Sequence, residues 1–587
     1  MTSLPYLIYT LFHTLPLHRY TPKTTNHFRN EYDYIIVGAG SAGSVVASRL
    51  SEEKCVTVLL LEVGNTPTIL TEIPILSSEW VGSNLDWKFK SVPQRHCASA
   101  LTNRQIMIPS GKAIGGTSVI NDMLSIRGNR HNYDEWAAMG AKGWSYDEVL
   151  PYFKKLEDYR NRHSADAYYH GFKGPITVSK PGYNSKLKKF LTEAVVSEGY
   201  QFVDPNGRRQ HGFYDPEGTI RDGRRCSTAK AYLVPSDNRT NLDIVPKAMV
   251  TKIDIQNKQA VGVYFQYKGS KHYVKARKEI IVSAGAYNTP KLLMLSGIGP
   301  KTELDRFNIP LISNLPVGHN LQDHIGGFML FELNNEIPTL LSQIINKDSI
   351  EQYVIYRTGI WSSFHALELL AFLHSNKNAE ANDYVNQEIY FGNVPGIFAL
   401  QRGATQEAFF SVFAPYLNKT LMLCMPQLVD PKSRGYVRLV STNPADLPEI
   451  NPNYFENPED SKVVVEGFRT CMKITKNAAF AKLQPKLVNP NYPSCQKYSH
   501  DTDKYYDCAA RAFPIASSHH VGTAKMGDPN DESTVLDYKL RVKTVKGLRV
   551  VDASVMPTIP WGNTNIPTIM IAEKASDMIR KTIKCSA

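Results

Sequence analysis

A short apolar run near the start of the chain, Tyr34–Val37, is typical of a strand that is buried on both faces of a parallel sheet. A glycine-rich turn follows at 38–43, and apolar positions at helical spacing then run from Val45 to Leu50. A second apolar run, Val56–Leu61, predicts the next strand. The pattern therefore predicts a strand–helix–strand unit of an α/β fold.

The glycines of this turn have the spacing of a dinucleotide-binding loop. Gly38 permits the tight turn, Gly40 lets the backbone approach a pyrophosphate, and Gly43 allows the helix and strand to pack closely. Ser41 lies where the helix begins, and the free N–H groups and positive dipole end of a helix favour phosphate at that point. Glu62 lies 19 residues after Gly43, close to the ~20 expected of the acid that binds the ribose hydroxyls. These residues predict a dinucleotide site but do not distinguish FAD from NAD.

Length and composition set the class of protein. With 587 residues, the chain is long enough for two to four domains at ~150 residues each. Hydrophobic residues make up 42% and charged residues 21%, which excludes a disordered, collagen-like or coiled-coil protein. The net charge of +12 is spread along the chain rather than clustered, so we expect neither nucleic acid nor a membrane surface as a partner.

Eight cysteines are too few for a disulfide scaffold in a chain of this length. Cys495 and Cys508 lie 13 residues apart in a polar segment, and we expect that they can close a loop disulfide. Cys55 borders an apolar strand, which predicts a small buried hydrophobic residue.

The N-terminus leaves the location of the protein open. Leu4–Leu17 is mostly apolar, but no basic residue precedes it, no small-residue cleavage site follows it, and it is too short to span a bilayer. Two glycosylation sequons begin at Asn238 and Asn418, as many as chance provides in such a chain. We expect residues 1–30 to be a leader or arm and the protein to be secreted, with a cytoplasmic protein as the alternative.

A second cluster of glycines and small hydroxyl residues lies at 109–118, where it either presents backbone amides to a ligand or forms a surface turn. Together with four other ordered motifs, it resembles the glucose–methanol–choline (GMC) oxidoreductase family over residues 31–580. The five motifs are 34–62, 111–121, 285–299, 315–324 and 562–565. The sequence segments 144–146 and 431–435 are most similar to the arthropod branch of this family, which includes insect glucose dehydrogenases.

The resemblance implies FAD as the cofactor and the oxidation of an alcohol to a carbonyl compound. It also implies two domains in an α/β protein. A Rossmann-like FAD-binding domain combines 31–330, with insertions near 150–230, and 520–587. A substrate domain, 331–519, is expected to be an antiparallel sheet capped by helices, with alternating runs such as 388–391 and 436–439.

Alcohol oxidation requires a base near the flavin, because the hydroxyl proton leaves as the hydride is transferred. The adjacent His519 and His520 are candidates, since the ordinary pKa of imidazole, ~6.5, is close to working pH. Chemistry does not choose between them. In the family, the catalytic histidine precedes the Gly-Thr pair by three residues, and this spacing before Gly522 implies His519.

The second catalytic group implied by the resemblance is Asn563, where relatives have His or Asn. Its amide would hydrogen-bond the substrate oxygen and stabilise the developing alkoxide. Asn565, two residues later, is the alternative. Asp552 matches a position that faces the ribityl chain and pyrophosphate.

Further cofactor-binding positions follow from the same resemblance. They are Gly116, Thr117, Asn121, Met123, Val250, Ala553 and Thr564, with Val250 at the adenine end. Ile120 stands where some relatives attach FAD covalently through a histidine, so we expect FAD to be non-covalent. Ser125 replaces a usual aromatic residue, which leaves the wall near 126–128 undefined, and the histidines at 319 and 324 are expected to be structural. No metal-binding spacing is present.

Two other functions fit the same motifs. A hydroxynitrile lyase on this scaffold would bind FAD without using it for redox chemistry. A non-catalytic secreted binding protein would require damage at His519 or Asn563, and neither is damaged. The expected partners are a small alcohol and oxygen or another electron acceptor. The sequence does not indicate which alcohol is used or what the oligomeric state is.

Overall fold

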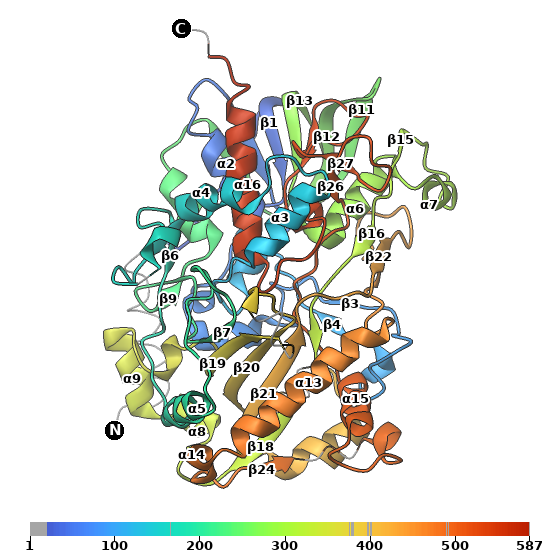
Figure 1. The fold of residues 1–587 in the computed structure, drawn as a ribbon. Helices are drawn as coiled ribbons and strands as arrows, with labels where there is room; N and C mark the ends of the chain where they lie inside the picture. Colours follow the sequence, from blue (N-terminus) through green and yellow to red (C-terminus); the bar gives the residue numbers. More distant parts are fainter. Residues whose placement is uncertain are drawn as a thin grey trace.

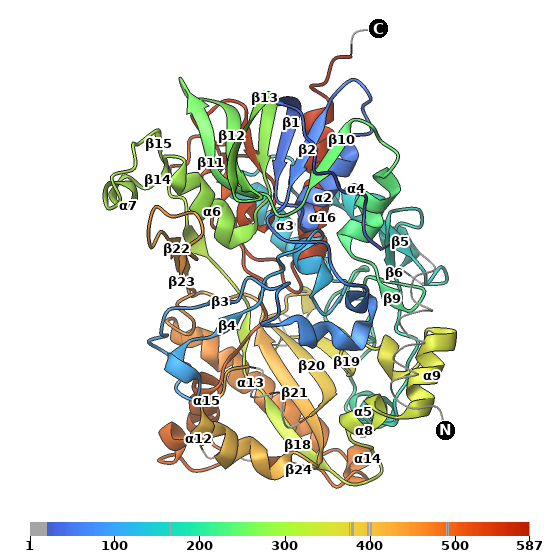
Figure 2. The ribbon, with the colours of Figure 1, turned by 180° about the vertical axis from the view of Figure 1, so that it is seen from behind.

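The computed structural model describes residues 20–585 except 165, 375, 377–380, 396, 397, 399–401, 489 and 491. The expected leader at 1–30 therefore lies mostly outside the described residues. Two sheets lie at opposite ends of the molecule, and the C-terminus lies at the end that holds the first of them (Figures 1 and 2). No helix among the described residues is long and apolar enough to cross a membrane.

The first sheet contains the predicted strand–helix–strand unit. β1 (Glu31–Val37) pairs in parallel with β2 (Val58–Leu61) on one side and with β13 (Ser270–Val282) on the other. All four residues of β2 and six of the seven in β1 are buried, as a strand covered on both faces requires. The other strands of this sheet are β10 (Leu242–Val245), β11 (Met249–Gln256), β12 (Gln259–Tyr267) and β28 (Leu548–Val550).

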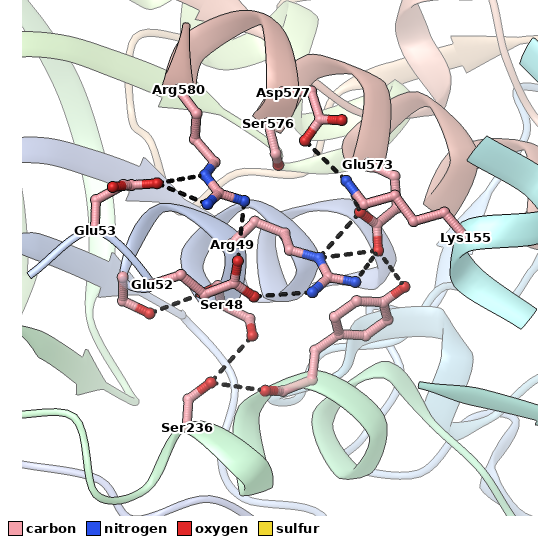
Figure 3. Close-up of polar contacts among 12 residues, drawn as sticks. Ser48, Arg49, Glu52, Glu53, Lys155, Ser236, Glu573, Ser576, Asp577 and Arg580 are labelled. Atoms are coloured by element: carbon pink, nitrogen blue, oxygen red, sulfur yellow. Dashed lines mark hydrogen bonds and ion pairs between the residues drawn. The ribbon is translucent and has the colours of Figure 1, made fainter. Parts of the chain in front are cut away.

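The C-terminal segment completes this part of the fold. Helix α2 (Ser41–Leu50) follows the glycine turn and packs along α16 (Asn565–Arg580) (Figures 1 and 2). Glu573 of α16 is fully buried, and its carboxylate accepts a hydrogen bond from Arg49 Nη2 at 2.7 Å and one from the Tyr232 hydroxyl at 2.9 Å (Figure 3). A buried carboxylate needs such partners, so this contact fastens the two ends of the chain together.

The second sheet has eight strands that pair antiparallel. Helix α13 (Pro458–Thr475) packs on β21 and α5 (Lys186–Ser197) packs on β19, so helices cover one face (Figure 1). Every residue of β20 is buried, which shows that the other face is covered as well. The strands are β7 (Gly212–Tyr214), β17 (Ile325–Gly326), β18 (Met329–Leu333), β19 (Leu367–Leu373), β20 (Gln387–Val394), β21 (Thr420–Leu428), β24 (Lys486–Val488) and β25 (Ile515–Ala516).

Three details differ from the sequence-based expectation. The run at 436–439 does not join the second sheet: β22 (Gly435–Arg438) pairs with β16 (His319–Leu321) and β23 (Glu449–Asn451) in a separate three-stranded sheet. β7 comes from the range expected as an insertion in the FAD-binding domain, yet it pairs with β19. The boundary expected between 330 and 331 falls inside β18. Alternation predicts a strand but not its partner, because pairing depends on distant parts of the chain.

Shorter elements connect the two sheets. The helices among them are α3 (Arg130–Ala138), α4 (Tyr146–Leu156), α6 (Gly285–Leu295), α7 (Lys301–Asp305), α8 (Leu340–Ile344), α9 (Lys347–Tyr356), α12 (Gln406–Ala408), α14 (Ala478–Ala481) and α15 (Asp503–Ala512). The strand pairs are β3 (Phe89–Lys90) with β4 (Met107–Ile108), β5 (Glu157–Tyr159) with β6 (Ile176–Val178), β8 (Ile220–Arg221) with β9 (Arg224–Arg225), β14 (Ile298–Gly299) with β15 (Ser313–Asn314), and β26 (Met526–Gly527) with β27 (Leu536–Asp537).

Three disulfides cross-link the described part of the chain. Cys495 and Cys508 are joined, as their spacing predicts. The prediction for Cys55 was wrong: this residue is exposed and is bonded to Cys585, 530 positions away. No local pattern could indicate a partner so distant in sequence. The third disulfide, Cys424 to Cys471, joins β21 to the helix that covers it.

Candidate active site

The first glycine turn can be built only from glycine at two positions. Gly38 has a φ of +101°, and a Cβ atom there would lie 2.4 Å from the Ser283 carbonyl oxygen. A Cβ atom at Gly43 would lie 1.8 Å from the Gly38 carbonyl oxygen. At Gly40, by contrast, the nearest atom to a Cβ would be the Gly116 Cα at 3.9 Å. Gly40 thus has room for a Cβ atom on the side that faces the second glycine cluster.

The second glycine cluster lies directly against the first. Gly116 has a φ of +54°, and a Cβ atom there would lie 2.5 Å from the Gly40 Cα. The Gly115 N–H donates to the Ala39 carbonyl at 2.7 Å. Thr117 Oγ1 accepts a hydrogen bond from the Gly111 N–H at 3.0 Å, which closes the loop. Two segments about 75 positions apart therefore form one wall of bare backbone.

Glu62 closes one end of this wall. Its carboxylate accepts hydrogen bonds from the backbone N–H of Ala39 at 2.8 Å and of Gly64 at 2.7 Å. Burial raises the pKa of Glu62 to about 7. A carboxylate has about four lone-pair positions, so it can still accept bonds from ribose hydroxyls.

A single cavity of about 370 Å³ connects Glu62 to the histidine pair, a volume within the range of small-molecule and cofactor sites. The cavity is lined by every residue predicted for the site except Gly43, whose role is packing. The lining residues from that prediction are Gly38, Gly40, Ser41, Glu62, Gly116, Thr117, Asn121, Met123, Val250, His519, Asp552, Ala553, Asn563 and Thr564.

The cavity wall carries buried polar atoms that have no hydrogen-bond partner in the part of the chain that the structure describes. They are Ser283 Oγ, Asn288 Oδ1, His365 Nδ1, His520 Nδ1 and Asn563 Oδ1. Leaving such an atom unpaired costs about 1–3 kcal/mol. A polar ligand that supplies partners along the wall, as a dinucleotide would, fits this arrangement.

Asp552 lies on the cavity wall, and each of its carboxylate oxygens already accepts two hydrogen bonds. Its Oδ2 accepts hydrogen bonds from the Thr289 hydroxyl at 2.6 Å and the Gly285 N–H at 2.9 Å. Its Oδ1 accepts hydrogen bonds from the Ser554 N–H at 2.8 Å and the Ser554 hydroxyl at 2.5 Å. Burial raises the pKa of Asp552. These contacts hold the start of α6 against the turn that carries Ala553.

His519 lies at the other end of the cavity, in a chain of ring contacts. Its Nε2 is 3.0 Å from Asn563 Nδ2, and its Nδ1 is 3.0 Å from His324 Nδ1. His324 Nε2 is 3.0 Å from the Val429 carbonyl oxygen. Burial lowers the pKa of His324 to about 3 and that of His519 well below its ordinary value, so both rings are neutral.

These contacts fix the position of each proton. The Val429 carbonyl can only accept, so His324 Nε2 carries a proton and donates it. Because His324 is neutral, its Nδ1 accepts, and His519 Nδ1 must then be the donor. The lone pair of His519 is therefore on Nε2, where it accepts a hydrogen bond from Asn563 Nδ2, and both residues line the cavity. Sequence reasoning treated His324 as structural, and only the fold places it against His519, 195 positions away.

His520 has a different environment. Its ring stacks on Tyr287, with the ring centroids 4.1 Å apart. Burial lowers its pKa to about 3. The His519 N–H donates to Asp323 Oδ1 at 2.6 Å, and Asp323 also accepts from the Tyr454 hydroxyl at 2.6 Å. This carboxyl holds the backbone so that the two adjacent rings face different neighbours.

A second group missed by sequence reasoning lies near Asn563. Burial and the nearby Glu388 raise the pKa of the Tyr390 hydroxyl on the cavity wall, and Asn563 acts on the same group. Glu388 is fully buried, accepts a 2.8 Å hydrogen bond from the Tyr214 hydroxyl, and has its pKa raised by burial to about 7. Alternation along β20 indicated a strand, but it did not show which face lines the cavity.

Arg225 holds Asn121, the predicted flavin neighbour. Its Nη1 donates to the Asn121 side-chain oxygen at 2.8 Å and to the Asn121 carbonyl at 2.6 Å. Residues 125–128, where the sequence left the pocket wall undefined, do not line the cavity, and Arg127 among them forms a buried ion pair with Glu157 at 2.6 Å. Within the described ranges, no cluster of three or more His, Cys, Asp or Glu residues could hold a metal.

Comparisons with known proteins agree with this geometry. The family models described as GMC oxidoreductase match residues 32–326 and 431–572. "Glucose dehydrogenase [FAD, quinone]" of Drosophila pseudoobscura pseudoobscura is 35% identical over 567 residues, covering 95% of this chain and 89% of that protein. Human mitochondrial choline dehydrogenase is 36% identical over 575 residues, covering 94% and 90%.

Solved structures of similar fold also include oxidases. Pyridoxine 4-oxidase from Mesorbium loti superposes with a TM-score of 0.79 at 26% identity, covering 94% of this chain and 100% of that one. A variant of formate oxidase from Aspergillus oryzae RIB40 superposes with a TM-score of 0.80 at 28% identity, covering 94% and 98%. The chain therefore belongs to the GMC oxidoreductase family, FAD-dependent enzymes that act on the CH–OH group of alcohols.

Proposed function

We propose that His519 Nε2 removes the hydroxyl proton of a small alcohol while the carbon-bound hydride is transferred to FAD. The observation that carries this proposal is the fixed tautomer of His519, which leaves its lone pair on Nε2, the atom in contact with Asn563 where both residues line the cavity. A general base must be unprotonated and within hydrogen-bond reach of its substrate. The neutral ring meets the first condition, and its position on the wall meets the second.

Asn563 lies beside the base and supplies the second contact. Its Nδ2 donates a hydrogen bond to the His519 lone pair at 3.0 Å, so a substrate hydroxyl that replaces this donor at Nε2 leaves the amide N–H groups beside its own oxygen. A donor fixed before the reaction stabilises an alkoxide as its charge develops. The Tyr390 hydroxyl lies near this amide on the same cavity wall. The two groups thus receive the proton and stabilise the oxygen from which it departs.

The cofactor lies along the backbone wall in this proposal. Gly38, Gly40 and Ser41 at the N-terminus of α2 bind the phosphates, and Glu62 binds the ribose. The wall near Asn121, Met123 and Thr564 receives the ring, and Val250 receives the adenine end. FAD, when bound, supplies the hydride acceptor. Ile120 offers no atom for a covalent bond, so acid precipitation should release the flavin into the supernatant.

An anaerobic flavin-reduction screen tests the reaction. The holoenzyme is mixed with representatives of four classes, sugars, ecdysteroids, aromatic alcohols and cyanohydrins, and the visible flavin band is followed. An alcohol oxidase or dehydrogenase bleaches the band with at least one alcohol. A lyase would consume a cyanohydrin while the band stays, and a binding protein would do neither. Either of these last two results would contradict the proposal.

We further propose that the electron acceptor is a quinone, the acceptor in the name of the fly relatives, with oxygen as the alternative. Stopped-flow mixing of the reduced enzyme with a soluble benzoquinone and with air-saturated buffer separates the two. Faster reoxidation by the quinone supports a dehydrogenase. Faster reoxidation by oxygen would show that the enzyme is an oxidase.

Secretion is also proposed, and two independent features support it. Three disulfides cross-link the described chain, and disulfides persist in oxidising compartments. The sequon residues Asn238 and Asn418 are both exposed. Expression of the full chain in insect cells should give a glycosidase-sensitive protein in the medium with all three disulfides formed. A cell-retained protein with reduced cysteines would favour the cytoplasmic alternative.

A further inference from the structure

Arg402 is the only charged side chain that the described residues of 331–518 contribute to the cavity wall. Polar lining residues from that region are His365, Tyr390, Gln427, Ser517 and Ser518. The apolar lining residues are Leu367, Val394, Phe398, Leu423, Met425, Pro444, Ile515 and Ala516. A cation in such a wall is unfavourable unless an anionic group in the cavity pairs with it.

The backbone around Arg402 is held in position. The N–H of Thr102 donates to the Gly403 carbonyl at 3.0 Å, and the N–H of Thr405 donates to the Ala100 carbonyl at 2.9 Å. The Arg402 N–H itself donates to the Phe398 carbonyl at 3.2 Å. Arg402 is therefore not a surface side chain on an untethered loop.

The guanidinium has no hydrogen bond or ion pair with any residue that the structure describes. Asp122, the carboxylate that acts on it electrostatically, lies beyond ion-pair distance and accepts a 2.7 Å hydrogen bond from the Ser77 hydroxyl. Burial lowers the pKa of Arg402. The residue is partly exposed and lines the cavity.

Two other buried arginines form ion pairs, and Arg225, which is buried without one, donates to carbonyl oxygens and to the Asn121 side chain. Arg127 lies 2.6 Å from a carboxylate oxygen of Glu157, and Arg549 lies 2.5 Å from one of Glu279. A partly buried guanidinium without an ion pair is costly, so a chain that keeps one at its substrate cavity gains from an anionic ligand. A guanidinium presents five N–H donors in a planar fork that matches carboxylate and phosphate oxygens.

We propose that the alcohol oxidised by this enzyme carries an anionic oxygen group, a carboxylate, phosphate or sulfate, which pairs with the Arg402 guanidinium while the hydroxyl lies at His519. The inference rests on the proposed alcohol oxidation at this site and adds the substrate class. It makes Arg402 a specificity-determining residue, with no part in the proton or hydride transfer.

Matched pairs of alcohols test the substrate class. The pairs are benzyl alcohol with 4-(hydroxymethyl)benzoate, 1-hexanol with 6-hydroxyhexanoate, and glucose with glucose 6-phosphate. Anaerobic flavin reduction by the holoenzyme should saturate at about 10- to 100-fold lower concentration for the anionic member of at least one pair, the value of one charge-assisted contact. The pairs with 4-(hydroxymethyl)benzoate and 6-hydroxyhexanoate test for a carboxylate, and the pair with glucose 6-phosphate tests for a phosphate.

Arg402→Gln should remove that preference while FAD content and the reduction rate by the neutral member stay unchanged. Arg306→Gln is the matched control, because Arg306 is exposed beside α7, paired with Glu303 and absent from the cavity wall. Equal saturation by the charged and neutral members of every pair in the wild type would overturn the proposal. So would a preference that survives in Arg402→Gln.

Benzoate, which has no alcohol to oxidise, separates this proposal from the proposed function. It should perturb the flavin spectrum of the wild-type holoenzyme and bind Arg402→Gln about 10- to 100-fold more weakly. If no alcohol reduces the flavin, the proposed function fails, and the benzoate measurement still decides the anion site. If the neutral alcohols reduce the flavin but benzoate binds both proteins equally or neither, only the Arg402 proposal fails.

Discussion

At the Glu62 end of the cavity the wall is backbone, whereas at the His519 end it is side chains. The first end is formed by two glycine turns in contact, Gly116 against Gly40, where a Cβ atom on Gly116 would clash. The second end is formed by rings and amides whose contacts join residues far apart in sequence, such as His324 and His519. A cofactor held by backbone can be the same in a whole family, while a substrate held by side chains can change with a few substitutions.

The largest expected effect at the backbone end of the cavity comes from adding one methyl group. Gly43→Ala places a Cβ atom 1.8 Å from the Gly38 carbonyl oxygen, a backbone atom that cannot move aside. We expect a loss of at least about 3 kcal/mol in the free energy of unfolding, the upper range of overpacking, with little folded protein recovered. Circular dichroism and thermal unfolding measure this loss.

Gly40→Ala is the matched control, because its nearest protein atom would be 3.9 Å away. This variant should fold normally and bind FAD more weakly, since the new methyl group faces the phosphates. Normal folding and normal FAD content in Gly43→Ala would contradict the packing role assigned to that glycine.

The link between the two ends of the chain gives the next largest effect. Glu573→Gln leaves the Arg49 guanidinium partly buried without its main counter-charge, and removing one partner of a buried pair costs about 3–5 kcal/mol. Glu53→Gln, at a partly exposed pair with Arg580, should cost at most about 1 kcal/mol. Urea unfolding of the two variants in parallel tests this. Equal destabilisation would show that the α2–α16 contact is not held by Glu573.

At the side-chain end, Asn563→Ala should slow anaerobic flavin reduction by an amount equivalent to about 2.7–4 kcal/mol, the value of one oxyanion donor. Asn565 is the alternative donor, and its Oδ1 accepts a 2.7 Å hydrogen bond from the Ser41 hydroxyl at the phosphate end. Asn565→Ala should therefore alter FAD retention more than the rate. A slower reduction in Asn565→Ala than in Asn563→Ala would reverse the two assignments.

Glu62→Ala gives the smallest effect, confined to the backbone end. The loss of a charged acceptor for ribose should weaken FAD binding by about 1.5–3 kcal/mol, with little change in the fold. Glu31→Ala serves as a control, because this exposed residue of β1 lies outside the cavity. Equilibrium dialysis of FAD measures the change. Binding as tight as in the wild type would remove Glu62 from the ribose site.

The contrast between the two ends explains how far the sequence could predict the structure. The glycine turn, the Tyr34–Val37 strand and Glu62 are local patterns, and the structure has β1, α2 and β2 at those positions within a few residues. His519 and Asn563 were found by resemblance rather than by any pattern of their own. The contact between His324 and His519, the Tyr390 hydroxyl and the pairing of Cys55 with Cys585 join distant segments. No spacing encodes such contacts, so only the folded chain reveals them.

The central claim is that His519, and not its neighbour, is the base. His519→Ala should slow anaerobic flavin reduction at least ~100-fold, because a general base contributes about 10²–10⁴-fold. His520→Ala removes a ring that stacks on Tyr287 and should cost less than about 10-fold, below that range. FAD content measured on the same samples separates lost chemistry from lost cofactor. A larger loss in His520→Ala than in His519→Ala, at equal FAD content, would contradict the catalytic assignment.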